Sequence, residues 1–129
     1  KTCLLNLKEQ FPNKKVILLF GCGGNRDQNK RSKMGKIADI YSDEIYLTDD
    51  NPRFENPNKI RADIKKGVKR KKNIIEISDR AKAISVSIQN LKTGEILGSV
   101  GKTGNVFDYQ LHFQVRKKSK PLDPIKYLY

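Results

Sequence analysis

The segment that most constrains the fold is an unbroken apolar run, Val16–Phe20, that leads directly into a glycine-rich stretch. A continuous run of this length is typical of a parallel strand that is buried on both faces of its sheet. The glycines that follow, at 21, 23 and 24, permit a tight turn and the close approach of another backbone. The run therefore predicts a buried strand of a parallel sheet that ends in a tight turn.

Helix and strand patterns alternate through the first part of the chain. Apolar residues recur at helical spacing in four segments, which predicts helices over 2–10, 33–42, 57–68 and 81–88. Strands are predicted over the apolar stretches 16–20, 44–48 and 73–77. Asn56-Pro57 is typical of a helix start, and Ser78-Asp79 supplies a cap for the last helix. The alternation predicts a Rossmann-like α/β fold, with a parallel sheet flanked by helices.

The character of the sequence changes after about residue 91, where glycine-punctuated, β-like segments replace the helical pattern. Strands are predicted at 96–97 and 109–116. The stretch 98–103 has the letters of a nucleotide-binding loop, but a full phosphate loop needs a Gly where Ile96 stands and a helix afterwards. A turn is therefore predicted there. We expect two domains, an α/β domain over 1–90 and a short β-rich C-terminal appendage over 91–129.

The charge balance favours a lysine-rich, solvated surface over a nucleic-acid interface. The net charge is +13, but most of the basic residues are Lys, spread along the whole length. Recognition of bases and phosphates favours Arg, so nucleic-acid binding through the basic surface ranks as the third functional hypothesis. Cys3 and Cys22 stand in no metal-binding spacing, and no apolar run is long enough for a signal peptide or a membrane span. We expect a monomeric, cytoplasmic protein without membrane association.

Two arginines stand at predicted strand ends within the α/β unit. Arg26 follows the strand over 16–20, and Arg53 follows the strand over 44–48 in the stretch Asp50-Asn51-Pro52-Arg53. Ligands of parallel α/β sheets bind beyond the carboxyl ends of the strands. A guanidinium can bind a carboxylate through two parallel hydrogen bonds. The pair therefore predicts a site for a small molecule rich in carboxylates.

Three long stretches carry a resemblance to a known family: FGCGGNRDQNKRSKMGKIA from residue 20, TDDNPRFENP from 48 and EISDRAKAI from 76. Through them the span from about 4 to 84 resembles the C-terminal domain of the Mur ligases, ATP-dependent enzymes of bacterial peptidoglycan synthesis. It is most similar to the type that adds meso-diaminopimelate to UDP-N-acetylmuramoyl-alanyl-glutamate. The resemblance implies the substrate-binding portion of such a ligase, as a fragment or fusion remnant that is not catalytic alone.

The same resemblance implies roles for individual residues. Arg26, Asp50, Asn51 and Arg53 are expected to bind the incoming diaminopimelate, and Arg53 is expected to grip the second carboxylate, which lysine lacks. Lysine-adding relatives typically carry a different residue at the position of Arg53. No catalytic or metal-binding residue is expected in this chain, because the phosphate loop, magnesium ligands and UDP-sugar pocket of the family belong to upstream domains. ATP, magnesium and the UDP-muramoyl-dipeptide are therefore expected only for the complete ligase.

The stretch over about 94–128 resembles the end of a lysostaphin-type zinc metallopeptidase domain, a family that cuts peptidoglycan peptides. His112 stands where a zinc-ligand His does, but the paired His is replaced by Gln110. His112 is the only His of the chain, and a catalytic zinc needs about three protein ligands. This resemblance therefore implies a degenerate tail that binds no metal. The alternative functional hypothesis is a non-catalytic peptidoglycan-binding or regulatory module.

Overall fold

The sheet of the domain has five strands in the order β3-β2-β1-β4-β5. A computed structural model describes residues 2–91, 96–101, 110–113, 115–117 and 120–122. Strands β1 to β4 run parallel, and β5 is antiparallel to β4. Two further strands, β6 and β7, pair with each other outside this sheet. The strands are β1 (Val16–Phe20), β2 (Glu44–Leu47), β3 (Ile74–Glu76), β4 (Ile96–Gly101), β5 (Gln110–Phe113), β6 (Val115–Lys117) and β7 (Lys120–Leu122).

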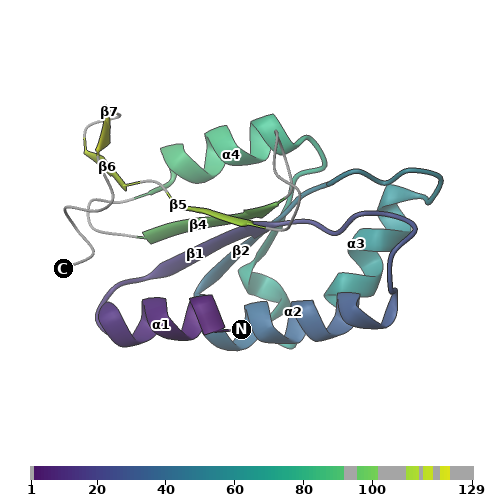
Figure 1. Cartoon of the computed structure of the whole chain (residues 1–129), viewed down its shortest axis with the longest axis horizontal. Coiled ribbons are helices and arrows are strands. Elements are labelled where there is room, and N and C mark those ends of the chain that lie inside the picture. The colour runs from purple at the N-terminus through teal and green to yellow at the C-terminus, as the bar shows by residue number, and fades with distance from the viewer. Residues whose placement is uncertain (1, 92–95, 102–109, 114, 118–119, 123–129) are drawn as a thin grey trace.

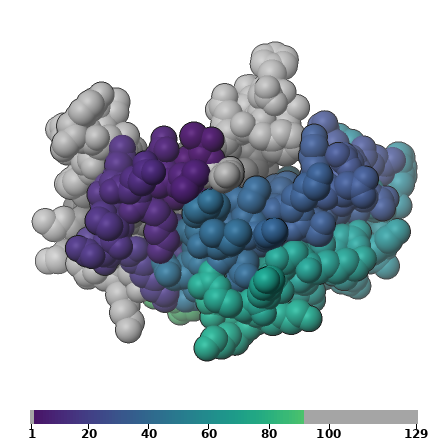
Figure 2. Space-filling view, turned by 90° about the horizontal axis from the view of Figure 1, so that it is seen from below, coloured from purple at the N-terminus to yellow at the C-terminus, as the bar shows by residue number. Residues whose placement is uncertain are grey.

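Helices cover both faces of the sheet. Helices α1, α2 and α3 lie on one face and α4 lies on the other (Figure 1). Seen from the first of these faces, α2 lies between α1 and α3 (Figure 2). The predicted Rossmann-like fold, a parallel sheet flanked by helices, is therefore confirmed. The helices are α1 (Thr2–Gln10), α2 (Asn29–Tyr41), α3 (Pro57–Lys65) and α4 (Arg80–Gln89), with a short 3-10 turn η1 (Lys71–Asn73) before β3.

Strand β1 is buried on both faces, as its apolar run predicts. Val16, Leu18 and Phe20 pack into an apolar cluster that includes residues of α1, α2 and α3. Ile17 and Leu19 point the other way and pack in a second cluster with residues of β2 and α4. Successive side chains of a strand point to opposite faces, so one unbroken apolar run fills both cores.

Helices α3 and α4 begin at the capping residues that the sequence predicts. Asn56 Oδ1 accepts a hydrogen bond from the Asn58 amide at 2.9 Å. Asp79 Oδ1 accepts one from the Lys82 amide, also at 2.9 Å. Both side chains satisfy amides that have no partner inside their helix. The two caps fix where the chain turns back after leaving the ends of β2 and β3.

Two helix boundaries differ from the sequence-based prediction by more than one residue. Helix α2 begins earlier, at Asn29, because its first turn is held by the buried Arg31 and not by an apolar residue. Helix α3 ends earlier, at Lys65. The chain there turns against α2, and a Cβ atom on Gly67 would lie 1.8 Å from the Ser32 carbonyl oxygen. A close backbone approach therefore ends the helix before its apolar pattern does.

The predicted turn over 98–103 is wrong for residues 98–101, which belong to β4. Strand β4 pairs with β1 on one side and with β5 on the other. Pairing on both sides keeps a glycine-rich segment extended, because strand formation depends strongly on tertiary context. The sheet thus continues past the predicted domain boundary at residue 90, and the division into two domains stays a prediction.

The winding of the sheet reverses at β1. The chain proceeds outward from β1 to β2 and β3, and then returns to place β4 on the other side of β1. Open α/β sheets bind their ligands at such a reversal, beyond the carboxyl ends of the strands. Gln110 and His112 of the proposed peptidase resemblance lie in β5, and their side chains are outside what the structure describes. Within the described residues, no helix is both long and apolar enough to cross a membrane.

Candidate functional site

Two loops meet at the carboxyl end of the sheet. The β1 loop (residues 21–28) follows β1, and the β2 loop (residues 48–56) follows β2. The Gly24 amide donates a hydrogen bond to the Asn51 carbonyl at 2.8 Å. The backbones are so close that a Cβ atom on Gly24 would lie 1.8 Å from the Pro52 carbonyl oxygen. The close backbone approach that the glycines predict is therefore present.

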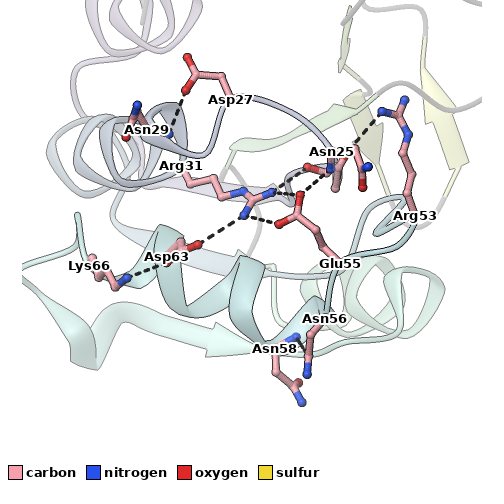
Figure 3. Close-up of polar contacts among 12 residues, drawn as sticks. Asn25, Asp27, Asn29, Arg31, Arg53, Glu55, Asn56, Asn58, Asp63 and Lys66 are labelled. Carbon is pink, nitrogen blue, oxygen red and sulfur yellow. Dashed lines mark hydrogen bonds and ion pairs between the residues drawn. The ribbon is translucent and has the colours of Figure 1, made fainter.

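Arg53 reaches from the β2 loop onto the β1 loop. Its φ is 51°, in the left-handed region that residues with a side chain rarely adopt. Asn51 Oδ1 accepts a hydrogen bond from the Arg53 amide at 3.2 Å, which holds this turn. Arg53 Nη1 donates to the Gly24 carbonyl at 3.3 Å (Figure 3). Arg53 is otherwise exposed, so a carboxylate in solvent can reach its guanidinium.

The β1 loop contains a second left-handed turn, at Asn25, whose φ is also 51°. The Asn25 amide donates to Glu55 Oε1 of the β2 loop at 2.5 Å. Arg26, the next residue, is exposed, and its Cγ lies 4.0 Å from where a Cβ atom of Gly23 would stand. Arg26 thus follows directly from a turn that the β2 loop holds in place.

Three of the four predicted site residues, Arg26, Asn51 and Arg53, gather where the two loops meet. Asp50 belongs to the β2 loop as well, where it is half-buried and its charge acts on Cys22 of the β1 loop. Burial raises the pKa of the Cys22 thiol to about 11, with Asp50 acting in the same direction and Arg31 against it. Asp50 therefore places negative charge next to the β1 loop.

Arg31 is a buried charged residue that the sequence-based site did not include. It is 1% exposed and donates from Nη1 and Nη2 to the two carboxylate oxygens of Glu55, each at 2.9 Å (Figure 3). Asp63 and the Gly23 carbonyl accept further hydrogen bonds from it at 3.3 Å and 3.4 Å. A buried charge is tolerated when it is paired and hydrogen-bonded. The hydrogen bond from Arg31 lowers the pKa of Glu55, which keeps that carboxylate ionised.

A second buried guanidinium holds the other end of the β2 loop. Arg61 of α3 is 7% exposed and donates from Nε to Glu76 Oε1 at 2.7 Å. It also donates to the side chains of Asp49 and Asn58. Asp49 lies near the start of the β2 loop and Glu55 near its end, so Arg61 and Arg31 anchor the loop on both sides of residues 50–54.

The spacing of buried residues along α2 could have predicted the burial of Arg31, but no sequence pattern predicts its partner Glu55. The buried residues of α2 are Arg31, Gly35, Ala38 and Asp39, which recur at the spacing of one helix face. Extending the predicted helix toward residue 29 places Arg31 on that face. Glu55 lies in a loop and is 24 residues from Arg31 along the chain, so no local pattern joins the two.

The α/β fold is that of the ligase domain of the Mur ligases. The chain matches the family model described as Mur ligase, glutamate ligase domain, over residues 1–103, and it belongs to this family. The match is longer than the motif-bearing span 4–84 and takes in strand β4. The resemblance to the Mur ligases stated from the sequence is therefore confirmed.

Curated relatives are named for one particular ligase of this family. The UDP-N-acetylmuramoyl-L-alanyl-D-glutamate--2,6-diaminopimelate ligase of Helicobacter pylori is 49% identical over 94 residues, which cover 73% of this chain and 21% of the relative. The enzyme of the same name from Aquifex aeolicus is 45% identical over 107 residues, covering 83% of this chain and 22% of the relative. This chain thus spans about a fifth of the length of these relatives, as their C-terminal domain.

A solved structure gives the same result for the fold. The structure of a UDP-N-acetylmuramoyl-L-alanyl-D-glutamate--2,6-diaminopimelate ligase matches with a TM-score of 0.70 and 33% sequence identity. The match covers 78% of this chain and 22% of that chain. The similarity lies in sequence as well as in fold.

Proposed function

We propose that the junction of the β1 and β2 loops binds meso-diaminopimelate, as the amino-acid recognition site of a peptidoglycan ligase. The observation that carries this proposal is the guanidinium of Arg53, which is anchored to the Gly24 carbonyl and yet exposed. A guanidinium in this state can bind a carboxylate through two hydrogen bonds. Diaminopimelate has a second carboxylate at its far end and lysine has none, so Arg53 distinguishes the two. The names of the relatives support the same substrate.

The neighbouring side chains complete the proposed site. Arg26 offers a second cation from the β1 loop, and Asn51 orients the turn that carries Arg53. Asp50 supplies a negative charge that suits an ammonium group of the amino acid. The two cations match the two carboxylates of diaminopimelate, and the one anion matches one of its two amino groups.

Peptide-bond formation belongs, in this proposal, to the complete ligase in the cytoplasm. ATP, magnesium and the UDP-muramoyl-dipeptide are its further substrates and cofactors. Among the residues that the structure describes, no three His, Cys, Asp or Glu side chains gather to hold a metal ion. We therefore assign amino-acid binding to the described residues, and the ATP-dependent step to the complete ligase.

Isothermal titration calorimetry of the 129-residue chain with meso-diaminopimelate and with L-lysine tests the proposal. We expect diaminopimelate to bind about tenfold or more tightly, as a charge-assisted hydrogen-bonded pair warrants. Arg53→Ala should remove this preference. Arg70→Ala, which removes a guanidinium paired with Asp39 of α2, should keep it. Equal affinities of the unaltered chain for the two ligands, or a preference that survives Arg53→Ala, contradict the proposal.

A further inference from the structure

Glu55 receives hydrogen bonds from two segments while belonging to a third. Its Oε1 accepts from Arg31 Nη2 at 2.9 Å and from the Asn25 amide at 2.5 Å, and its Oε2 accepts from Arg31 Nη1 at 2.9 Å. Glu55 lies two residues after Arg53 in the β2 loop, and Asn25 comes directly before Arg26 in the β1 loop. The carboxylate of Glu55 therefore joins the two turns that carry the exposed arginines.

Arg31 itself is placed to act on these turns and not on a ligand. It is 1% exposed, and its guanidinium donates to Glu55, Asp63 and the Gly23 carbonyl. These acceptors belong to the β2 loop, α3 and the β1 loop, so one rigid planar group from α2 ties three segments together (Figure 3). A Lys ammonium at this position would donate from a single nitrogen and cannot reproduce the geometry of the planar guanidinium.

We propose that Arg31 and Glu55 are positioning residues that fix the Asn25–Arg26 turn relative to Arg53 and thereby set the specificity for a ligand with a terminal carboxylate. This inference rests on the proposed function. A bidentate carboxylate contact tolerates little displacement of the guanidinium, because a small misplacement of an interacting group weakens the interaction many-fold. Lysine has no carboxylate at its far end, so its affinity changes little when Arg53 shifts. Loosening the pair therefore reduces the ratio of the two affinities more than it reduces the affinity for lysine.

Arg31→Lys and Glu55→Gln test the inference in the full chain, with calorimetry against meso-diaminopimelate and L-lysine. Both variants should lower the affinity ratio of diaminopimelate to lysine by about tenfold. Asp39→Asn is the matched control, because it weakens the pair between Asp39 of α2 and Arg70. Asp39 also accepts a hydrogen bond from the Lys69 amide, and neither Lys69 nor Arg70 belongs to the two loops. The control should keep the ratio. An unchanged ratio in both test variants, with circular dichroism showing that they are folded, overturns the positioning role.

Amide hydrogen exchange in the free protein tests the same inference without a ligand. The amides of Gly24 and Asn25, bonded to the β2 loop, should exchange about tenfold or more faster in Glu55→Gln, as expected for local opening. The Thr48 amide, which donates to the Phe20 carbonyl between β1 and β2, should keep its rate.

The two experiments separate the two proposals. If the unaltered chain binds neither amino acid, the proposed function fails, and faster exchange at Asn25 still supports the coupling of the loops. Unchanged exchange at Asn25 in both Glu55→Gln and Arg31→Lys overturns the coupling, whatever the ligand. An equal rise in exchange at Asn25 and Thr48 indicates general destabilisation and also counts against it.

Discussion

The amide of Gly24 is hydrogen-bonded to the carbonyl of Asn51 at 2.8 Å, and the carbonyl of Gly24 accepts from the guanidinium of Arg53 at 3.3 Å. One residue of the β1 loop thus contacts two residues of the β2 loop, once as a donor and once as an acceptor. The loops cannot separate without losing both hydrogen bonds. The geometry of the proposed binding site therefore depends on the packing of two backbones as much as on any side chain.

Alanine at Gly24 should destabilise the fold far more than alanine at Gly23. A Cβ atom would lie 1.8 Å from the Pro52 carbonyl oxygen at Gly24, but 3.4 Å from the Asn51 carbonyl oxygen at Gly23. The first distance forces the loops apart, at a cost of about 1–3 kcal/mol in the free energy of unfolding. Urea unfolding of the two variants measures the difference. Equal losses in both variants contradict the close packing of the loops.

Glycine at Arg53 should give a more stable protein than alanine at the same position. The φ of 51° is a left-handed conformation that costs a residue with a Cβ atom about 1 kcal/mol more than glycine. Both substitutions remove the guanidinium, so both should lose the preference for diaminopimelate over lysine. Chemical unfolding compares their stabilities, and a more stable Arg53→Ala argues against the left-handed turn.

The two cysteines should differ strongly in reactivity at neutral pH. Burial raises the pKa of Cys22 to about 11, whereas Cys3 is exposed. The thiolate is the nucleophile, so iodoacetamide should label Cys3 about 100-fold or more faster than Cys22 at neutral pH. Labelling of Cys22 should accelerate as the pH approaches its pKa. Mass spectrometry of the labelled peptides measures both rates, and similar rates at neutral pH contradict the burial of Cys22.

Acid should weaken the contact between Arg31 and Glu55. The hydrogen bond from Arg31 lowers the pKa of Glu55 in the folded state below its ordinary value of 4.5. The resulting stabilisation is complete above the unfolded-state pKa and is lost as the pH falls through the lower, folded-state pKa. Glu55→Gln should therefore flatten the fall in stability below about pH 4.5.

Glu9→Gln is the matched control for this pH dependence, because Glu9 is an exposed carboxylate on α1. Thermal unfolding across the acidic range compares the two variants with the unaltered chain. Glu9→Gln should follow the unaltered chain, and Glu55→Gln should not. If all three curves have the same slope, Glu55 contributes nothing to the acid dependence.

The sequence predicts those parts of the fold that depend on local pattern. The apolar run of β1 predicts a strand buried on both faces, and Asn56 and Asp79 predict the starts of α3 and α4. Strand β4 escapes such prediction because its extended form comes from pairing with β1 and β5 and not from its own glycine-rich sequence. Local patterns cannot report hydrogen bonds that a distant strand supplies.

The candidate site divides in the same way. Arg26 and Arg53 are predictable because each follows a strand, and the carboxyl ends of parallel strands share one edge of the sheet. Arg31 is not, because a charged side chain predicts exposure unless its partners are known. Its partners Glu55 and Asp63 lie 24 and 32 residues away in the chain. Buried ion pairs of this kind become visible only in three dimensions.

The burial of Arg31 has a consequence for how this lysine-rich chain tolerates substitution. Exchange of Arg for Lys conserves charge and is the mildest change that the composition suggests. At Arg31 it removes the planar fork that contacts Glu55 with both terminal nitrogens. A substitution that conserves charge can therefore still remove the contact, because Lys does not have the shape of the guanidinium. We therefore expect Arg-to-Lys substitutions to be tolerated according to the contacts that each guanidinium makes, and not according to the large number of cations in the chain.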